Sequence, residues 1–373
     1  MTTHEKYVLP VEHVTWDVPM TGAARFTWEY DEGNARLLAL YQKGKDKQWD
    51  ATTRIDWSQE IDRDNPLGLA PETNALLGTR QWDKIKNDPA EVGRMRRHLI
   101  AWQFSQFLHG EQGAMICSAR IVESVPGLDA KFYASTQTMD EARHAETYSR
   151  FLQDKLGLLY PINPHLKVLL DQTLSDSRWD MPYLGMQVLI EGLALAAFGV
   201  LRDMTTVGLP KQILAFVMQD EARHVAFGRM ALKAYYAELT DAERAEREDF
   251  VVEGCYLMRD RLRGQEVWQT LGYDVAECDE ASTQSGFMQA FRSLLFSRIV
   301  PCVKDIGLWG EKVQKAYADM GVLDMAGVDL DALMKSDEDT AERLDTERRE
   351  LDTRRAQVEQ IIEVGRTAAV AGV

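Results

Sequence analysis

The sequence predicts an all-α protein organised around a four-helix bundle, and two observations support this prediction. One pattern occurs twice: Glu111 precedes Glu141 by 30 residues, and Glu191 precedes Glu221 by 30 residues. Each second glutamate lies inside an Asp-Glu-Ala-Arg-His run. The segment around this pattern, residues 92–239, has an almost continuous helical hydrophobic period, with turn residues near the middle of each half.

Each half of this segment is expected to form a helical hairpin. In the first half Pro126 lies 15 residues from both glutamates. At a rise of about 1.5 Å per residue, both carboxylates are then roughly 22 Å from the turn. The turn of the second half is expected at residues 208–210, at nearly equal distances from its two glutamates. Two such hairpins packed face to face bring four glutamates to one height inside a bundle.

The two Asp-Glu-Ala-Arg-His runs also add a histidine beside each second glutamate. His144 follows Glu141 at i+3 and His224 follows Glu221 at i+3, so each pair points from one side of its helix. The surrounding faces are apolar, and a bare carboxylate there needs a proton, a partner or a metal. Two divalent cations would balance four converging carboxylates. The alternative is a pair of amphipathic hairpins with ion pairs on their surfaces.

This double pattern resembles the ferritin-like superfamily of carboxylate-bridged non-haem di-iron proteins, over about residues 92–240. Its oxygen-activating members include bacterial multicomponent monooxygenases, the ribonucleotide reductase small subunit and aminobenzoate N-oxygenases. The resemblance implies a ferritin-like four-helix bundle with a di-metal core plus extra flanking helices. It also implies two iron ions, although the same ligands accept a Mn/Fe pair. The implied ligands are Glu111, Glu141 and His144 from one half, and Glu191, Glu221 and His224 from the other, with Glu141 and Glu221 able to bridge.

The resemblance assigns roles to the neighbours of these ligands as well. Asp140 and Asp220 are expected to orient the ligating histidines, and Arg143 and Arg223 to neutralise those acids. Tyr148 is the candidate catalytic side chain, since its position resembles that of a radical-forming tyrosine; a hydrogen bond to the metal surroundings, without radical chemistry, is the favoured role. Four apolar side chains near the glutamates are candidate walls of a substrate pocket: Phe107, Met115, Leu195 and Phe198.

Outside the bundle, the chain is expected to add structure to one domain. Residues 1–80 are predicted to wrap around the bundle, residues 81–240 to form it, and residues 241–373 to add helices that end in a charged helix. In the wrap, a helix is expected to begin at Asn34 as N-cap, with inward-facing Leu37, Leu38 and Tyr41. The tryptophans there are expected to pack against the bundle: Trp16, Trp28, Trp49 and Trp57. Further helices are expected near residues 165–174, 240–271, 283–297, 301–320 and 335–362.

Composition excludes several classes of protein. A net charge of −16 argues against a nucleic-acid-binding surface. The four cysteines are scattered and form no Cys-x-x-Cys pair, which favours reduced thiols in a cytoplasmic protein. The N-terminus lacks a signal-peptide pattern, and no apolar stretch of about 18 residues stands out. We therefore expect no membrane span.

The function expected from these observations is that of an oxygen-activating di-iron oxidase or monooxygenase. Its substrates would be molecular oxygen and a small apolar or aromatic molecule. Electrons must come from an external reductase or ferredoxin, because the chain carries no flavin, nicotinamide or iron–sulfur motif. A homodimer is left open.

Three alternatives to this function are distinguishable. A radical-generating subunit similar to that of ribonucleotide reductase would show a tyrosyl radical. An arylamine N-oxygenase is the second alternative. Aminobenzoate N-oxygenases carry a third histidine four residues before the glutamate of the second Glu-x-x-His motif, which is Glu221 here. This sequence has Val217 at that position and so lacks the third histidine. Iron storage is the third, and it is disfavoured because storage domains are much shorter.

Overall fold

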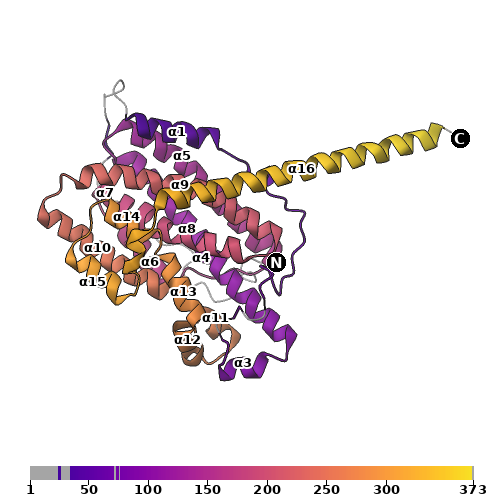
Figure 1. The fold of residues 1–373 in the computed structure, drawn as a ribbon, viewed down its shortest axis with the longest axis horizontal. Helices are drawn as coiled ribbons and strands as arrows, with labels where there is room; N and C mark the ends of the chain where they lie inside the picture. The colour runs from indigo at the N-terminus through magenta and orange to yellow at the C-terminus, as the bar shows by residue number, and fades with distance from the viewer. Residues whose placement is uncertain (1–23, 27–33, 71–72, 75, 372–373) are drawn as a thin grey trace.

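The structure is a computed structural model that describes residues 24–26, 34–70, 73–74 and 76–371. These residues form helices and no strand (Figure 1), which confirms the all-α prediction. Trp16 and Trp28 lie outside the described residues. Trp49 and Trp57 are half-buried and pack against the core, as expected.

The first hairpin consists of α4 (Pro89–Ser124) and α5 (Leu128–Arg150). The Asp88 side chain caps α4, and Pro89 occupies the first turn, where no backbone N–H is needed. Val125 to Gly127 form the turn, in agreement with the sequence. A π-helix, η2 (Phe151–Leu156), continues α5 and ends at Gly157, whose φ is 65°.

The second hairpin consists of a composite helix and α9 (Gly208–Tyr236). The composite helix runs through α7 (Asp180–Tyr183), η3 (Leu184–Ile190) and α8 (Glu191–Met204). The predicted turn at residues 208–210 is wrong by a few residues, because the turn precedes Gly208. Pro210 lies in the first turn of α9, where a missing N–H is tolerated. As a result Thr206 is 15 residues from both Glu191 and Glu221, which reproduces the spacing of the first hairpin.

The composite helix is more apolar than the sequence analysis recognised. Within the described residues one helix, Asp180–Met204, is long and apolar enough to span a membrane, and its most apolar 18-residue stretch has a mean hydropathy of 1.9. Of its most apolar stretch, 89% is buried inside the protein. A helix that is hydrophobic all round is expected at the centre of a large helical core, which is where this one lies.

A short helix, α6 (Pro164–Ser175), joins the two hairpins, and its N-cap Asn163 accepts hydrogen bonds from its first turn. The next helix, α10 (Asp241–Asp260), begins with the capping box expected at Thr240, but it does not reach residue 271. Gly264 has a φ of 64° and separates η4 (Arg261–Arg263) from α11 (Gln265–Leu271). Left-handed glycine ends helices because it lacks a Cβ.

Similar breaks divide the later expected helices. The helix expected at 283–297 is two helices, α12 (Val275–Gln284) and α13 (Gly286–Leu295). The one expected at 301–320 is divided at Gly307, where φ is 87°, into α14 (Ile299–Asp305) and α15 (Glu311–Asp319). A short 3-10 turn, η5 (Leu323–Gly327), follows.

The N-terminal helix α1 (Ala35–Asp46) packs against α5 and α9. Asn34 caps it, as predicted, and Leu37 is buried. Leu38 does not face inward: its side chain is 37% exposed, because only a narrow stripe of α1 meets the bundle. Two short helices follow, α2 (Ala51–Arg54) and α3 (Arg80–Ile85).

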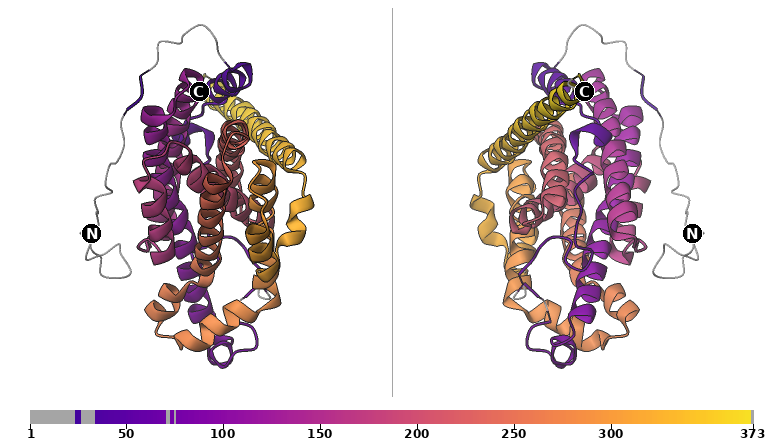
Figure 2. Two further views of the ribbon diagram at one scale, coloured as in Figure 1. Left: turned by 90° about the vertical axis from the view of Figure 1, so that its left-hand side faces the viewer. Right: turned by 90° about the vertical axis from the view of Figure 1, so that its right-hand side faces the viewer.

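The last helix, α16 (Leu330–Ala371), begins against the bundle and then leaves it. Buried Asp337 forms ion pairs with Arg202 of α8 and Arg298, which fixes the start of the helix. Lys43 of α1 and Lys47, its C-cap, pair with acidic side chains further along α16. Arg54 and Thr53 of α2 contact Asp345 and Arg348, and beyond these contacts the helix projects from the body (Figure 1). Figure 2 shows the same helix foreshortened, because it looks along the helix from its two ends.

Candidate metal centre

The structure brings all six predicted ligands together in the middle of the bundle. They come from α4, α5, α8 and α9, and none is more than 5% exposed. Two overlapping groups have ligand atoms within 4.8 Å of one another. One group is Glu111, Glu141, His144 and Glu221, and the other is Glu141, Glu191, Glu221 and His224.

Glu141 and Glu221 belong to both groups, which is the arrangement that two bridged cations need. Four buried carboxylate oxygens, one each of Glu141 and Glu191 and both of Glu221, have no hydrogen-bond partner among the described residues. Unpartnered buried acceptors are rare in folded proteins unless an ion or water satisfies them. The donor set and the free oxygens therefore fit a buried carboxylate/histidine di-metal site.

The two histidines present one nitrogen to the carboxylates and the other to an aspartate. His144 Nδ1 lies 3.0 Å from Glu221 and 3.3 Å from Glu111, while its Nε2 lies 3.0 Å from Asp220. His224 Nδ1 lies 3.0 Å from Glu141, while its Nε2 lies 3.3 Å from Asp140. An Nε2–H that donates to aspartate leaves the Nδ1 lone pair facing the carboxylates, as a metal ligand requires.

Without metal, the pKa values of the ligands indicate that protons neutralise the buried carboxylates. Burial raises the pKa of Glu111 and Glu191 well above the ordinary value, and the charge of Glu221 raises it further. Burial alone would lower the pKa of both histidines. The hydrogen bond from His144 to Asp220, and the charge of Glu141 beside His224, raise the histidine pKa values well above normal instead. Protons therefore take the place of metal charge in this pocket.

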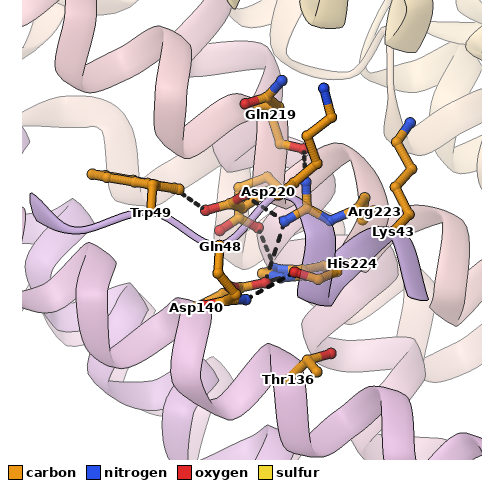
Figure 3. A network of polar contacts seen from close by, with 12 residues as sticks. Lys43, Gln48, Trp49, Thr136, Asp140, Gln219, Asp220, Arg223 and His224 are labelled. Atoms are coloured by element: carbon orange, nitrogen blue, oxygen red, sulfur yellow. Dashed lines mark hydrogen bonds and ion pairs between the residues drawn. The ribbon is translucent and has the colours of Figure 1, made fainter. Parts of the chain in front are cut away.

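The aspartates orient the histidines crosswise, which the sequence did not reveal. Asp140 contacts His224, from the opposite hairpin (Figure 3), and Asp220 contacts His144. We expected each aspartate to act on a ligating histidine, and the structure shows that each acts on the histidine of the other half. A pair of contacts thus crosses between α5 and α9.

Two arginines complete this group of buried charges. Arg143 donates to Asp140 and, at 2.8 Å, to Asp220, while Arg223 donates to Asp220 and lies 3.4 Å from Asp140. Both side chains are at most 6% exposed. Burial would raise the pKa of Asp220, but the charge of Arg223 holds it well below its ordinary value. The predicted neutralisation of the aspartates is therefore present, and each arginine serves both.

Sequence reasoning missed two residues of this network, which lie between α1 and α2. Trp49 donates its indole N–H to Asp220 at 2.7 Å (Figure 3). Gln48 donates to Asp140 at 2.7 Å and accepts from Arg143 at 2.7 Å. The Arg143 guanidinium also lies 4.7 Å from the centre of the Trp49 ring. Both residues are far from the repeat in sequence, and no spacing rule pointed to them.

An aromatic cluster lies beside the Glu111 end of the centre. The Tyr148 ring contacts Phe104, Phe107 and Phe198, and Phe107 meets Phe198 edge-to-face at 4.6 Å between ring centres. The buried Tyr148 hydroxyl has no hydrogen-bond partner in the described part of the chain, and the hydrogen bond to the metal surroundings stays a prediction. Burial and the charges of Glu111 and Glu221 raise its pKa well above normal.

A cavity of about 160 Å³ lies against the first half of α4. It is lined mainly by apolar side chains of α4, α8 and later helices, including Ile100, Trp102 and Leu201, with Arg96 also on its wall. Ile100 precedes Glu111 by 11 residues, or roughly 16 Å along α4. The predicted pocket residues do not line this cavity: Phe107 and Phe198 lie in the aromatic cluster, Leu195 is buried in the core, and Met115 is half-buried on the far side of Glu111.

A comparison with protein families agrees with this geometry. The model of the p-aminobenzoate N-oxygenase AurF family matches residues 31–307, which is about three-quarters of the chain. The chain belongs to the AurF family. As a member it is an oxygen-dependent di-metal oxidoreductase. No curated protein sequence matched the chain.

Solved structures similar to this AurF-family chain are variants of an R2-like ligand-binding oxidase reconstituted with a Mn/Fe cofactor. A tyrosine-to-phenylalanine variant, reconstituted anaerobically, has a TM-score of 0.47 and 18% identity, and the match covers 76% of this chain and 95% of that one. A valine-to-leucine variant, reconstituted aerobically, has a TM-score of 0.46 and 17% identity over the same shares.

The pKa shifts predict how pH acts on this AurF-family protein without metal. Glu111, Glu191, His144 and His224 have a higher pKa in the folded protein than their ordinary values, which are near 4.5 for Glu and 6.5 for His. Such groups stabilise the fold when the pH is below the ordinary pKa. This stabilisation is lost as the pH rises from the ordinary pKa through the folded-state pKa. The melting temperature of metal-free protein should therefore fall between pH 6.5 and 9, and excess Mn²⁺ should reduce the fall. Scanning calorimetry with and without the metal checks this; equal curves would contradict it.

Proposed function

We propose that this protein is an oxygen-dependent N-oxygenase of a small aromatic amine. Glu111 and His144 would hold one metal ion, Glu191 and His224 the other, with Glu141 and Glu221 between them. The observation that supports the proposal best is the pair of overlapping ligand groups that share Glu141 and Glu221, in a chain of the AurF family. Iron in both positions is the simplest assignment, and manganese in one suits the same ligands.

Bound metals would supply the reduction of molecular oxygen, using electrons from an external reductase or ferredoxin. The side chains of the chain would orient the metal ligands and exclude water. The arginine–aspartate group and Trp49 hold the histidine rings in place. The aromatic rings around Tyr148 lie beside Glu111, and such an apolar wall keeps bulk water from the reacting groups.

The cavity supplies a place for the substrate. Its apolar walls suit an aromatic ring, and the Arg96 side chain on its wall suits an acidic group on that ring. The indole N–H of Trp102 and the side-chain N–H of Asn74 are buried and have no hydrogen-bond partner among the described residues. Half-buried Arg96 likewise makes no ion pair there. An aromatic amine that carries a carboxylate fits these features.

Oxidation at carbon is the second candidate, and Val217 favours it. This position carries a third histidine in aminobenzoate N-oxygenases, but here it is a valine with no exposed surface. The centre therefore has no extra nitrogen at that position, which is closer to the ligand set of a monooxygenase or oxidase.

Product analysis separates the two candidates. Iron-loaded protein, supplied with a ferredoxin, its reductase and oxygen, should convert p-aminobenzoate to N-oxygenated products detectable by mass spectrometry. Ring-hydroxylated products would favour oxidation at carbon. Growth of ferric mineral well beyond two ions per chain, without product, would overturn both in favour of iron storage.

Tyr148 provides a further prediction for this reaction. Replacing it by phenylalanine removes a hydroxyl that has no hydrogen-bond partner in the described structure, so the ring packing should survive. We expect turnover to stay within about threefold of the unaltered protein, because no polar contact is lost. Steady-state product formation measures this. Loss of activity together with a tyrosyl radical signal in the unaltered protein would favour a radical-generating subunit instead.

A further inference from the structure

A buried glutamine contacts two of the proposed ligands at once. Gln137 lies on α5 and has no exposed surface. Its Nε2 donates to Glu141 Oε1 and to Glu191 Oε1, both at 3.0 Å. One amide group thus joins a carboxylate shared by both ligand groups to a carboxylate found in only one of them.

The amide leaves the second oxygen of each carboxylate free. Oε2 of Glu141 and Oε2 of Glu191 are buried and accept no hydrogen bond among the described residues. Glu141 Oε2 lies 3.3 Å from His144 Nδ1, whereas Oε1, which Gln137 holds, lies 3.0 Å from His224 Nδ1. A carboxylate with one oxygen held by an N–H has a fixed plane, and its other oxygen keeps lone pairs for a cation. Gln137 therefore determines which oxygen of each ligand is available.

A second glutamine holds Gln137 in this orientation. Gln187 of η3 donates to Gln137 Oε1 at 3.4 Å and is itself fully buried. Gly228 of α9 permits the close packing of Gln187, since a Cβ at residue 228 would come within 2.5 Å of the Gln187 side chain. The orientation of the Gln137 amide is thus set by two helices of the other hairpin.

The other half of the repeat lacks such an amide. Gln137 precedes Glu141 by four residues, and the position four residues before Glu221 is Val217. Within the described structure Glu111 has no amide donor; its hydrogen bond is with the His144 ring. The pseudo-symmetry of the six ligands is therefore broken by one side chain.

We propose that Gln137 is a positioning residue that makes the two metal positions unequal, because it holds Glu191, which belongs only to the group with His224, together with the shared Glu141. The inference rests on the ligand assignment proposed above. Neutral hydrogen-bond donors behind ligating carboxylates tune metal affinity by about 10–100-fold. The position next to Glu191 should depend on Gln137 more strongly than the position next to Glu111, because Gln137 holds both Glu191 and the shared Glu141.

Anaerobic titration of the full-length protein with Mn²⁺, followed by calorimetry, tests the proposal. Gln137→Met keeps the length and apolar packing of the side chain but removes the donor. We expect one of the two binding steps to weaken by about 10–100-fold and the other by a clearly smaller factor. Gln187→Met, which leaves Gln137 in place but unsupported, should weaken the same step by a smaller factor. The electron paramagnetic resonance spectrum of bound Mn²⁺ should change in both variants.

Val217→Ala serves as the matched control, because it disturbs the equivalent place in the other half without removing a donor. It should lower the melting temperature and leave the ratio of the two binding constants unchanged. Equal weakening of both steps in Gln137→Met, or no change in either, would overturn the proposal. Failure of the ligand assignment gives a different result, since the unaltered protein would then not bind two Mn²⁺ ions.

Discussion

Replacing Glu141 by alanine should abolish binding of both metal ions, whereas replacing Glu111 by alanine should abolish binding of one. Glu141 belongs to both groups of converging ligand atoms, and Glu111 belongs to only one. Without Glu141 each cation loses a ligand, and three remaining carboxylates balance two cations less well. Metal analysis of protein from iron-replete cells should give close to zero ions per chain for Glu141→Ala and close to one for Glu111→Ala.

The matching change on the other hairpin, Glu221→Ala, should resemble Glu141→Ala, since Glu221 is also shared. Glu146→Ala is the control: it lies on α5 beside these residues, but its side chain is exposed. It should retain two ions. If Glu141→Ala and Glu111→Ala lost metal to the same extent, the sharing of Glu141 would be wrong.

Replacing the aspartates by asparagine should weaken metal binding at the opposite half of the centre. Asp220→Asn should perturb the position beside His144, and Asp140→Asn the position beside His224, because each aspartate contacts the histidine of the other hairpin. The expected loss is about 10–100-fold in affinity at the affected position. Stepwise Fe²⁺ titration under anaerobic conditions measures both constants.

These variants should also lower stability, because a buried arginine loses a charged partner. Breaking one side of a buried ion pair typically costs about 3–5 kcal/mol, and Arg143 and Arg223 each contact both aspartates. Asp154→Asn, at an exposed site of η2, should change neither property. Unchanged metal binding in both buried variants would mean that the histidines are oriented by other groups.

The parts of this protein that could be predicted from sequence are those that depend on local periodicity. Glu111 and Glu141 are equidistant from a proline turn, and His144 follows by one helical turn, so helix geometry alone places them together. Helix ends at glycine were harder to predict. Gly264 and Gly307 adopt positive φ angles, and each divides a segment that was predicted to be one helix. The prediction was wrong because the apolar pattern continues across a short break in the helix.

Contacts between distant segments could not be predicted. Gln48 and Trp49 reach Asp140 and Asp220 across more than 90 residues of sequence, and nothing in their spacing marks them. Gln137 was visible as a polar residue on an apolar face, one turn before Glu141, and that signal was overlooked. The crossed contacts of the aspartates depend on how the hairpins pack, which a helical period does not contain.

The crossed contacts bear on how this protein can vary over generations. A substitution at Asp140 acts on a histidine 84 residues away, so a change in one hairpin has to be compensated in the other. Neither hairpin, separated at the link before α6, would keep the partner of its own histidine. Two identical copies of one hairpin would satisfy both contacts, because each hairpin provides an aspartate and needs one. In this respect the two hairpins of the chain resemble the two subunits of a dimer that have been joined. Because each hairpin holds the histidine of the other, the two cannot change these residues independently.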